Sequence, residues 1–139
     1  MPNGEMNLSI LIKNMQPILN DGLYVFLCVP HLDNLDFDEL LLVFKEKEGT
    51  TVVVTQYYAD RLGFAYSSTF AWISLHVHSA LEAVGLTAAF ATALGKADIS
   101  CNVVAAFYHD HIFVPHHQAQ KALETLQQLA QSAASLSQD

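Results

Sequence analysis

A chain of 139 residues is long enough for one ordinary domain or for two very small ones that share a core. Hydrophobic residues make up 52% of it and charged residues 14%, which excludes a mainly disordered chain. A formal net charge of -8 excludes the basic surface that nucleic-acid binding requires. The longest apolar run, Leu23 to Val29, is far shorter than the roughly 20 residues that span a bilayer, and the first residues lack the basic leader of a signal peptide. We therefore expect an acidic, globular, cytoplasmic protein that binds neither nucleic acid nor a membrane.

The first half of the chain alternates short helical and extended patterns. Asn20-Asp21-Gly22 predicts a turn, and the β-branched and aromatic run after it predicts a strand covered on both faces. Gly63 is expected to end a short helix. The predicted elements are, in chain order, a helix over 7–15, a turn at 20–22, a strand over 23–29, two strands over 41–47 and 51–56 joined as a hairpin, and a helix over 57–62.

The second half predicts the order strand, helix, strand, strand, helix. Its elements are a strand over 70–77, a helix from residue 86 to 97, a strand over 100–108, a turn at 109–110, a returning strand over 111–114, and a helix from Pro115 to about residue 130. This order is a split βαβ unit without its last strand. We infer that a strand of the first half, near Pro17 to Leu19, completes the sheet. The small, polar stretch 64–69 divides the chain into predicted domains 1–66 and 67–139.

Two cysteines, Cys28 and Cys101, lie far apart in the chain, each inside an apolar segment. This arrangement excludes a CxxC redox motif and a zinc ribbon. It predicts two buried thiols in a reducing compartment, where each behaves as a small hydrophobic side chain.

Histidine is the only abundant reactive residue type. His76 and His78 share a face of one predicted strand, and His109 and His111 lie on either side of a turn. The spacings match no standard zinc motif, which favours structural histidines over a metal site. The sequence also lacks a nucleophile elbow and a phosphate-binding glycine loop. We therefore expect neither a metal, nor a cofactor, nor an enzyme.

The passage from strand to helix at Gly85 is more informative. Free backbone N–H groups and the helix dipole at such a start can hold a carboxylate. Gly85 can equally serve only to permit a tight turn. The residues themselves leave both alternatives open.

The stretch VHSALEAVGLTAAFATALGKADISCNVVAAFYHDHIFVP, at 77–115, resembles an ACT domain, a small regulatory ligand-binding module. Gly85-Leu86 matches the family's loop glycine and the apolar residue after it, and 98–103 matches the passage from helix to strand. Val84 stands where the family commonly has proline. From about residue 8 to 130 the chain is similar to short, stand-alone tandem ACT proteins of bacteria, whose first half carries a hairpin like FKEKEG at 44–49.

The resemblance implies an α+β fold, in which two ferredoxin-like βαββαβ copies have antiparallel sheets and helices on one face. It also implies a non-enzymatic regulatory protein that forms a homodimer or higher homo-oligomer. Family members typically bind amino acids or other small effectors where ACT units meet. An amino acid bound in this way would place its carboxylate near Gly85, Leu86 and Thr87. The ligand-binding residues expected from this are Ser79, Glu82, Gly85, Leu86, Thr87 and Asn102, with Ser79 or Glu82 at the ammonium group.

Two other functions remain open. The chain could be an interaction module that assembles through ACT-type sheet pairing without any ligand. It could also be an enzyme that uses His76, His78, His109 or His111 together with Glu82.

Overall fold

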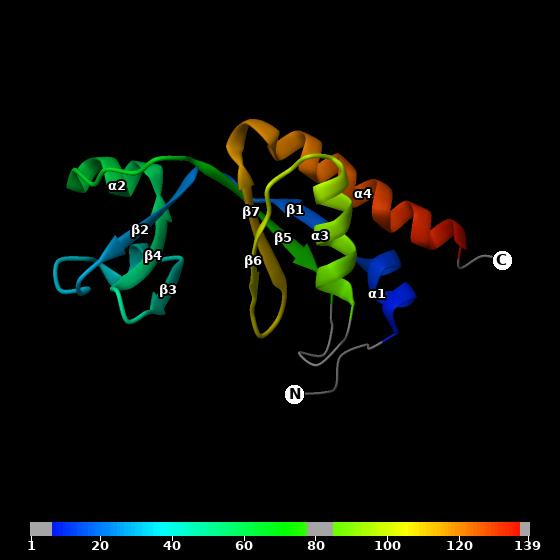
Figure 1. The fold of residues 1–139 in the computed structure, drawn as a ribbon, viewed down its shortest axis with the longest axis horizontal. Coiled ribbons are helices and arrows are strands. Elements are labelled where there is room, and N and C mark those ends of the chain that lie inside the picture. Colours follow the sequence, from blue (N-terminus) through cyan, green and yellow to red (C-terminus); the bar gives the residue numbers. More distant parts are fainter. Residues whose placement is uncertain (1–6, 78–84, 137–139) are drawn as a thin grey trace.

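The computed structural model describes residues 7–77 and 85–136 of the chain (Figure 1). The elements in order are α1 (Leu8–Asn14), β1 (Gln16–Leu19), β2 (Tyr24–Val29), the 3-10 helix η1 (Phe37–Glu39), β3 (Leu42–Lys45), β4 (Thr50–Thr55), α2 (Gln56–Leu62), β5 (Phe70–His76), α3 (Leu86–Lys96), β6 (Asn102–Ala105), β7 (Asp110–Pro115), the 3-10 helix η2 (His116–Gln118) and α4 (Ala119–Leu136).

Local side-chain and backbone chemistry sets the ends of the short helices. The Asn7 side chain accepts a hydrogen bond from the Ile10 backbone N–H at 3.3 Å at the start of α1, and the Thr55 hydroxyl accepts one from Tyr58 N–H at 3.1 Å at the start of α2. Gly63 ends α2 with a φ of 77°, in the left-handed region that glycine adopts without strain. The expected end of this helix at Gly63 is confirmed.

The strands form one antiparallel sheet in the order β3-β4-β2-β5-β7-β6, and β1 also pairs with β5. We call β2, β3, β4 and α2 the first unit, and β1, β5, β6, β7, α1, α3 and α4 the second unit. Figure 1 shows the strands of the first unit on the left with α2 above them, and the strands of the second unit in the centre with α1, α3 and α4 to their right. The expected α+β fold is therefore confirmed.

Strand β1 supplies the fourth strand of the second unit, as the sequence predicted. It pairs antiparallel with β5, from Gln16 opposite His76 to Leu19 opposite Ile73. The next strand, β2, meets the other end of β5 where Tyr24 lies opposite Phe70. Strands β1 and β2 therefore follow each other along β5, and the turn at 20–22 carries the chain from one unit to the other instead of closing a hairpin.

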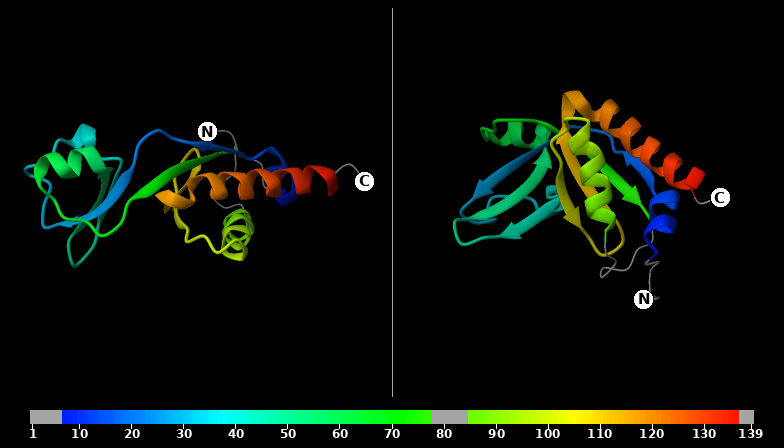
Figure 2. Two further views of the ribbon diagram at one scale, coloured as in Figure 1. Left: turned by 90° about the horizontal axis from the view of Figure 1, so that it is seen from above. Right: turned by 45° about the vertical axis from the view of Figure 1, so that its right-hand side comes forward.

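Each unit buries one face of its strands beneath its helices. In the second unit, Ile73 of β5 packs with Phe90 of α3 and Leu126 of α4, and all three are fully buried. The view from above shows α3 and α4 on the same side of the strands (Figure 2). In the first unit, Val52 of β4 belongs to the core that Tyr58 of α2 covers. Side chains alternate along a strand, so every second residue points to the opposite face, which carries no helix.

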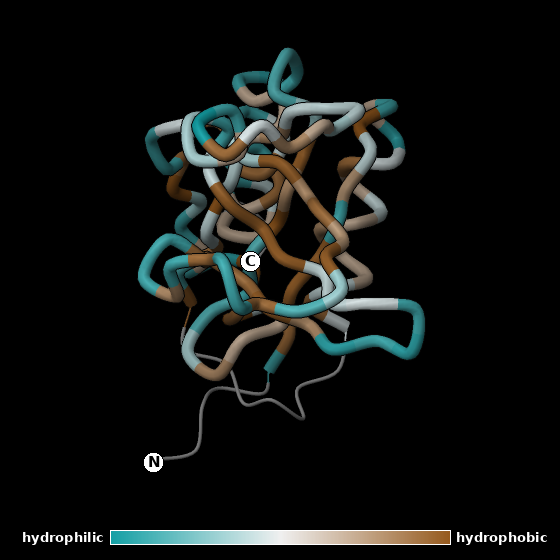
Figure 3. The backbone as a smooth tube through the Cα atoms, turned by 90° about the vertical axis from the view of Figure 1, so that its left-hand side faces the viewer, coloured by the Kyte–Doolittle hydropathy of each residue, from teal (hydrophilic) through white to brown (hydrophobic). Residues whose placement is uncertain are grey.

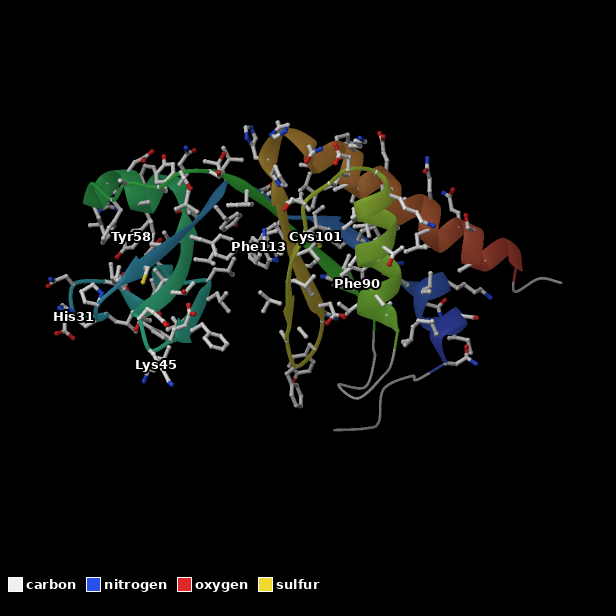
Figure 4. The ribbon with its side chains drawn as sticks, viewed as in Figure 1. His31, Lys45, Tyr58, Phe90, Cys101 and Phe113 are labelled. Atoms are coloured by element: carbon white, nitrogen blue, oxygen red, sulfur yellow. The ribbon has the colours of Figure 1, made fainter. Side chains whose placement is uncertain are left out.

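The helix-free faces of the two units cover each other through aromatic side chains. Phe26 of the first unit meets Phe113 of the second with ring centroids 5.4 Å apart, and Tyr24 meets Trp72 at 5.6 Å, both edge to face. The Phe113 side chain lies between the two units in Figure 4. Together with Val53, Leu42, Phe70 and Val104 these rings form what we call the aromatic layer. The aromatic layer requires the sheet to curl, so that the strands of the first unit face the strands of the second.

The first unit is a shortened version of the expected βαββαβ pattern. Between β2 and β3 the structure has the 3-10 helix η1, only 3 residues long, in place of a full α-helix. Leu32, Leu35 and Leu40 in this connection pack against the core of the unit. The acidic residues of this connection are exposed. Hydrophilic segments likewise occupy the connections around the hydrophobic strands in Figure 3.

Two expectations need correction. Cys28 is exposed, not buried. It shares the helix-free face of β2 with Tyr24 and Phe26, but it lies at the end of the strand that the second unit does not cover. The strand predicted over 100–108 is shorter: β6 ends at Ala105, and a turn closed by Ala106 N–H donating to His109 C=O at 3.1 Å follows it.

The aromatic layer predicts a large effect for one phenylalanine. Phe113 is 2% exposed between the units, so Phe113→Ala should lower the free energy of unfolding by about 3–5 kcal/mol through lost burial and a cavity. Phe44→Ala is the matched control, because Phe44 is 63% exposed. This substitution should change the free energy of unfolding by less than about 0.5 kcal/mol. Urea unfolding of both variants measures the difference, and equal losses would contradict the assigned role of the layer.

Candidate functional site

The start of α3 has the geometry that a carboxylate site needs. Gly85 is the N-cap residue with a φ of 99°, and its C=O accepts the first helical hydrogen bond, from Ala89 N–H at 2.9 Å. The N–H groups of the first turn, those of Leu86, Thr87 and Ala88, precede that bond and have no partner within the helix. No side chain of the described residues caps them. The positive end of an 11-residue helix dipole adds to their attraction for an anion.

The three residues at this start differ in exposure. Leu86 is 3% exposed and anchors the helix in the core of the second unit, whereas the Thr87 side chain is exposed. A Cβ added to Gly85 would lie 3.0 Å from Leu8 Cδ2 of α1. The backbone conformation favours glycine here, and a larger residue would also have to displace the end of the Leu8 side chain.

The structure does not bring Asn102 to the same place. Asn102 begins β6, beyond the far end of α3, and its side-chain amide donates to Phe113 C=O at 3.3 Å. An α-helix rises about 1.5 Å per residue, so the 11 residues of α3 span about 16 Å. One small ligand at Gly85 therefore cannot also touch Asn102 of the same chain. The other two expected ligand residues, Ser79 and Glu82, lie outside the described residues, as does His78.

A histidine network on the helix-free face of the second unit was not predicted as a unit from the sequence. The rings of His76 and His109 stack with centroids 4.4 Å apart and planes 10° from parallel. His111 Nδ1 accepts a hydrogen bond from Trp72 Nε1 at 3.0 Å and lies 3.1 Å from the hydroxyl of Ser74. Residues 72, 74 and 76 of β5 alternate onto one face. Trp72 and Ser74 lie opposite Phe113 and His111 of β7, and His109 immediately precedes that strand, so the period of two and the pairing of these strands would have revealed the network.

Burial and neighbouring charge keep His111 neutral. Desolvation lowers its pKa from the ordinary value of 6.5, and the nearby His109 and His76 lower it further. Desolvation raises the pKa of the adjacent Asp110, an effect that His109 partly offsets. A neutral ring is also what the Trp72 contact demands, because an indole N–H only donates and so requires an unprotonated Nδ1.

The remaining candidates for metal binding or nucleophilic chemistry are weak within the described part of the chain. There, no group of three His, Cys, Asp or Glu side chains is arranged to hold a metal ion. Cys101 packs against the core of the second unit, and burial raises the pKa of its thiol to about 11. Its thiol is therefore protonated at neutral pH, as expected for a structural cysteine.

The lowered pKa of His111 predicts a pH-dependent stability. As the pH falls, His111 of the unfolded chain binds a proton before His111 of the folded protein does. The free energy of unfolding should therefore decrease from about pH 6.5 downwards, until the pH has passed the lowered pKa of His111 in the folded protein. His111→Gln cannot titrate and should flatten this decrease. His117→Gln, at an exposed position, is the matched control and should leave it unchanged. Urea unfolding at pH 7.5 and 5.5 measures both, and the same decrease in His111→Gln as in the wild type would refute the assignment.

No helix among the described residues is long and apolar enough to cross a membrane. Comparison with family models gives two consecutive matches, both described as an ACT domain, at residues 3–71 and 67–128. No curated protein matches the chain.

Solved structures resemble the chain over most of its length. A Vibrio cholerae protein of unknown function, described as a possible transport protein, is 46% identical, with a TM-score of 0.81 over 88% of this chain and 95% of that one. A protein from Agobacterium tumefaciens is 13% identical, with a TM-score of 0.63 over 84% of this chain and 89% of that one. The ligand-free regulatory subunit of aspartate kinase from Thermus thermophilus is 10% identical, with a TM-score of 0.59 over 81% and 95%. The two consecutive ACT-domain matches of this chain, together with its curled antiparallel sheet and flanking helices, place it in the ACT-domain family.

Proposed function

We propose that this protein is a non-enzymatic regulator that binds an amino acid at the start of α3. ACT domains are generally regulatory modules that bind amino acids, and this chain consists almost entirely of two of them. One structural neighbour is the regulatory subunit of an aspartate kinase. The observation that carries the proposal is the first turn of α3, whose N–H groups follow a glycine in the left-handed conformation and have no side-chain cap from the described part of the chain.

In this proposal the N–H groups of Leu86 and Thr87 bind the carboxylate of the amino acid. The ammonium group is assigned to Ser79 or Glu82, on the segment that leads into the helix. Asn102 is too far along the same chain to take part, so it reaches the ligand only from a second copy. The chemistry is binding alone, and the acidic, disulfide-free chain is assigned to the cytoplasm.

We also propose that the protein is a homo-oligomer that pairs through the outer edge of β6. Strands β3 and β6 end the sheet. Strand β6, with the sequence NVVA, has neither a charge nor a proline, which are the usual protections of an edge, whereas β1 contains Pro17 and β3 ends in Lys45. Val103 on β6 is 36% exposed.

A charge at the start of α3 should separate ligand binding from stability. Thr87→Glu puts a carboxylate where the ligand's own carboxylate would lie, so it should abolish the increase in melting temperature that the bound amino acid causes. The same charge favours the helix dipole and should stabilise the free protein by about 0.3–1 kcal/mol. The matched control is Thr92→Glu, at an exposed position in the middle of α3.

The measurement is a thermal-shift screen with the individual amino acids at millimolar concentration, repeated on both variants. A shift that survives equally in Thr87→Glu and Thr92→Glu would place the ligand elsewhere. If no amino acid shifts the wild type, the regulatory binding function is wrong, and the free strand edges then favour the alternative of a ligand-independent interaction module.

Self-association has its own test. Light scattering of the wild type at micromolar concentration should give at least twice the monomer mass. Val103→Lys puts a charge on the β6 edge and should shift the protein toward monomer, whereas Ile18→Lys, at a 42% exposed position on β1, should not. A wild type that stays monomeric at all concentrations would contradict the proposed homo-oligomer. Dissociation by Ile18→Lys but not by Val103→Lys would show that the interface lies at β1 instead of β6.

A further inference from the structure

A cavity of about 140 Å³ lies between the helix-free faces of the two units, at the edge of the aromatic layer. The first unit contributes Leu41 and Leu42, and the second unit contributes the other lining residues. These are Trp72, Val104, Ala106, His111 and Phe113. Leu41 is 39% exposed, so this side of the cavity is accessible from solvent. The cavity is on the opposite face of the sheet from α3 and is distinct from the amino-acid site proposed above.

The chemistry of the cavity wall does not suit a free amino acid. Its lining is apolar apart from the polar edges of Trp72 and His111, and His111 is its one titratable residue. No carboxylate lines it to neutralise an ammonium group. A cavity of similar volume, about 150 Å³ in an engineered example, accepts small apolar molecules such as benzene. The wall therefore favours a small, mainly apolar molecule without a positive charge.

The histidine network fixes which ring nitrogen of His111 carries the proton. Nδ1 is engaged by the indole N–H of Trp72 at 3.0 Å, so the proton of the neutral ring is on Nε2. Two further contacts hold Nδ1 in position: the hydroxyl of Ser74 lies 3.1 Å from Nδ1, and this hydroxyl accepts a hydrogen bond from the Asn20 side chain at 3.0 Å. Ser74 is 3% exposed, so these contacts are shielded from water. Within the described residues, Nε2 on the opposite edge has no hydrogen-bond partner.

We propose that this cavity is a second ligand site, which takes a small, uncharged, apolar molecule carrying one hydrogen-bond acceptor. Its apolar body contacts Leu42, Val104 and Phe113, and its acceptor oxygen receives the proton of His111 Nε2. Since Leu42 belongs to the first unit and His111 to the second, an occupied site adds contacts between the units.

The probe is cyclohexanone, and its matched control is methylenecyclohexane, which has the same ring with a CH₂ group in place of the oxygen. Trp72 is the single tryptophan of the chain, so its indole N–H gives one unambiguous NMR signal inside the proposed site. Titration with cyclohexanone should shift this signal saturably. Methylenecyclohexane should bind about fivefold more weakly, because it cannot accept the hydrogen bond from Nε2.

Two alanines on neighbouring positions provide the matched variants. Ala106 lines the cavity, whereas Ala105 alternates to the other face and is exposed. Ala106→Phe should fill the site and abolish the saturable shift, and Ala105→Phe should retain it, while both keep the dispersed amide spectrum of a folded protein.

Three results would overturn the proposal. They are no saturable shift of the wild-type Trp72 signal, the same shift in a folded Ala106→Phe variant, and equal affinities for the two probes. If Ala106→Phe does not fold, the wild-type titration and the comparison of the two probes still show whether the proposed site binds cyclohexanone through its oxygen.

Discussion

The two units are held together because each has a helix-free sheet face that water would otherwise contact. Helices cover one face of each unit, and the aromatic layer around Phe26 and Phe113 covers the other. Burying large rings against each other in edge-to-face contacts is among the strongest apolar contributions available to a small protein. The curl of the sheet, the position of the histidine network and the cavity between the units all follow from this one contact surface.

The path of the chain reinforces the same contact. Strand β5 pairs with β1 and β7 of its own unit and touches β2 of the first unit at Tyr24. The Asn20 backbone N–H donates to Trp72 C=O at 2.9 Å at the crossing between the units. Because the N-terminal strand completes the second unit before the chain enters the first, the second unit consists of two stretches of sequence, with the first unit inserted between them. This interlocking makes it difficult for one half to unfold while the other remains folded.

The same arrangement separates two chemically different environments. The start of α3 presents backbone donors to an anion at the outside of the second unit. The space between the units is apolar, with a neutral imidazole as its donor.

The sequence by itself determined most of the elements and the likeness to the ACT-domain family. Helical spacing, the β-branched runs, Gly63 and the GLTA start of α3 were read from local pattern, because caps, turns and amphipathic faces depend on residues close in the chain. The β1–β5 pairing was also inferred, since a split βαβ unit without its last strand needs one more. Only the tertiary structure decided that Cys28 is exposed, that Asn102 lies a helix length away from Gly85, and that Trp72, Ser74 and His111 form one network. These depend on which part of one unit covers the other, and that is set by the curl of the sheet and by contacts between residues far apart in the chain.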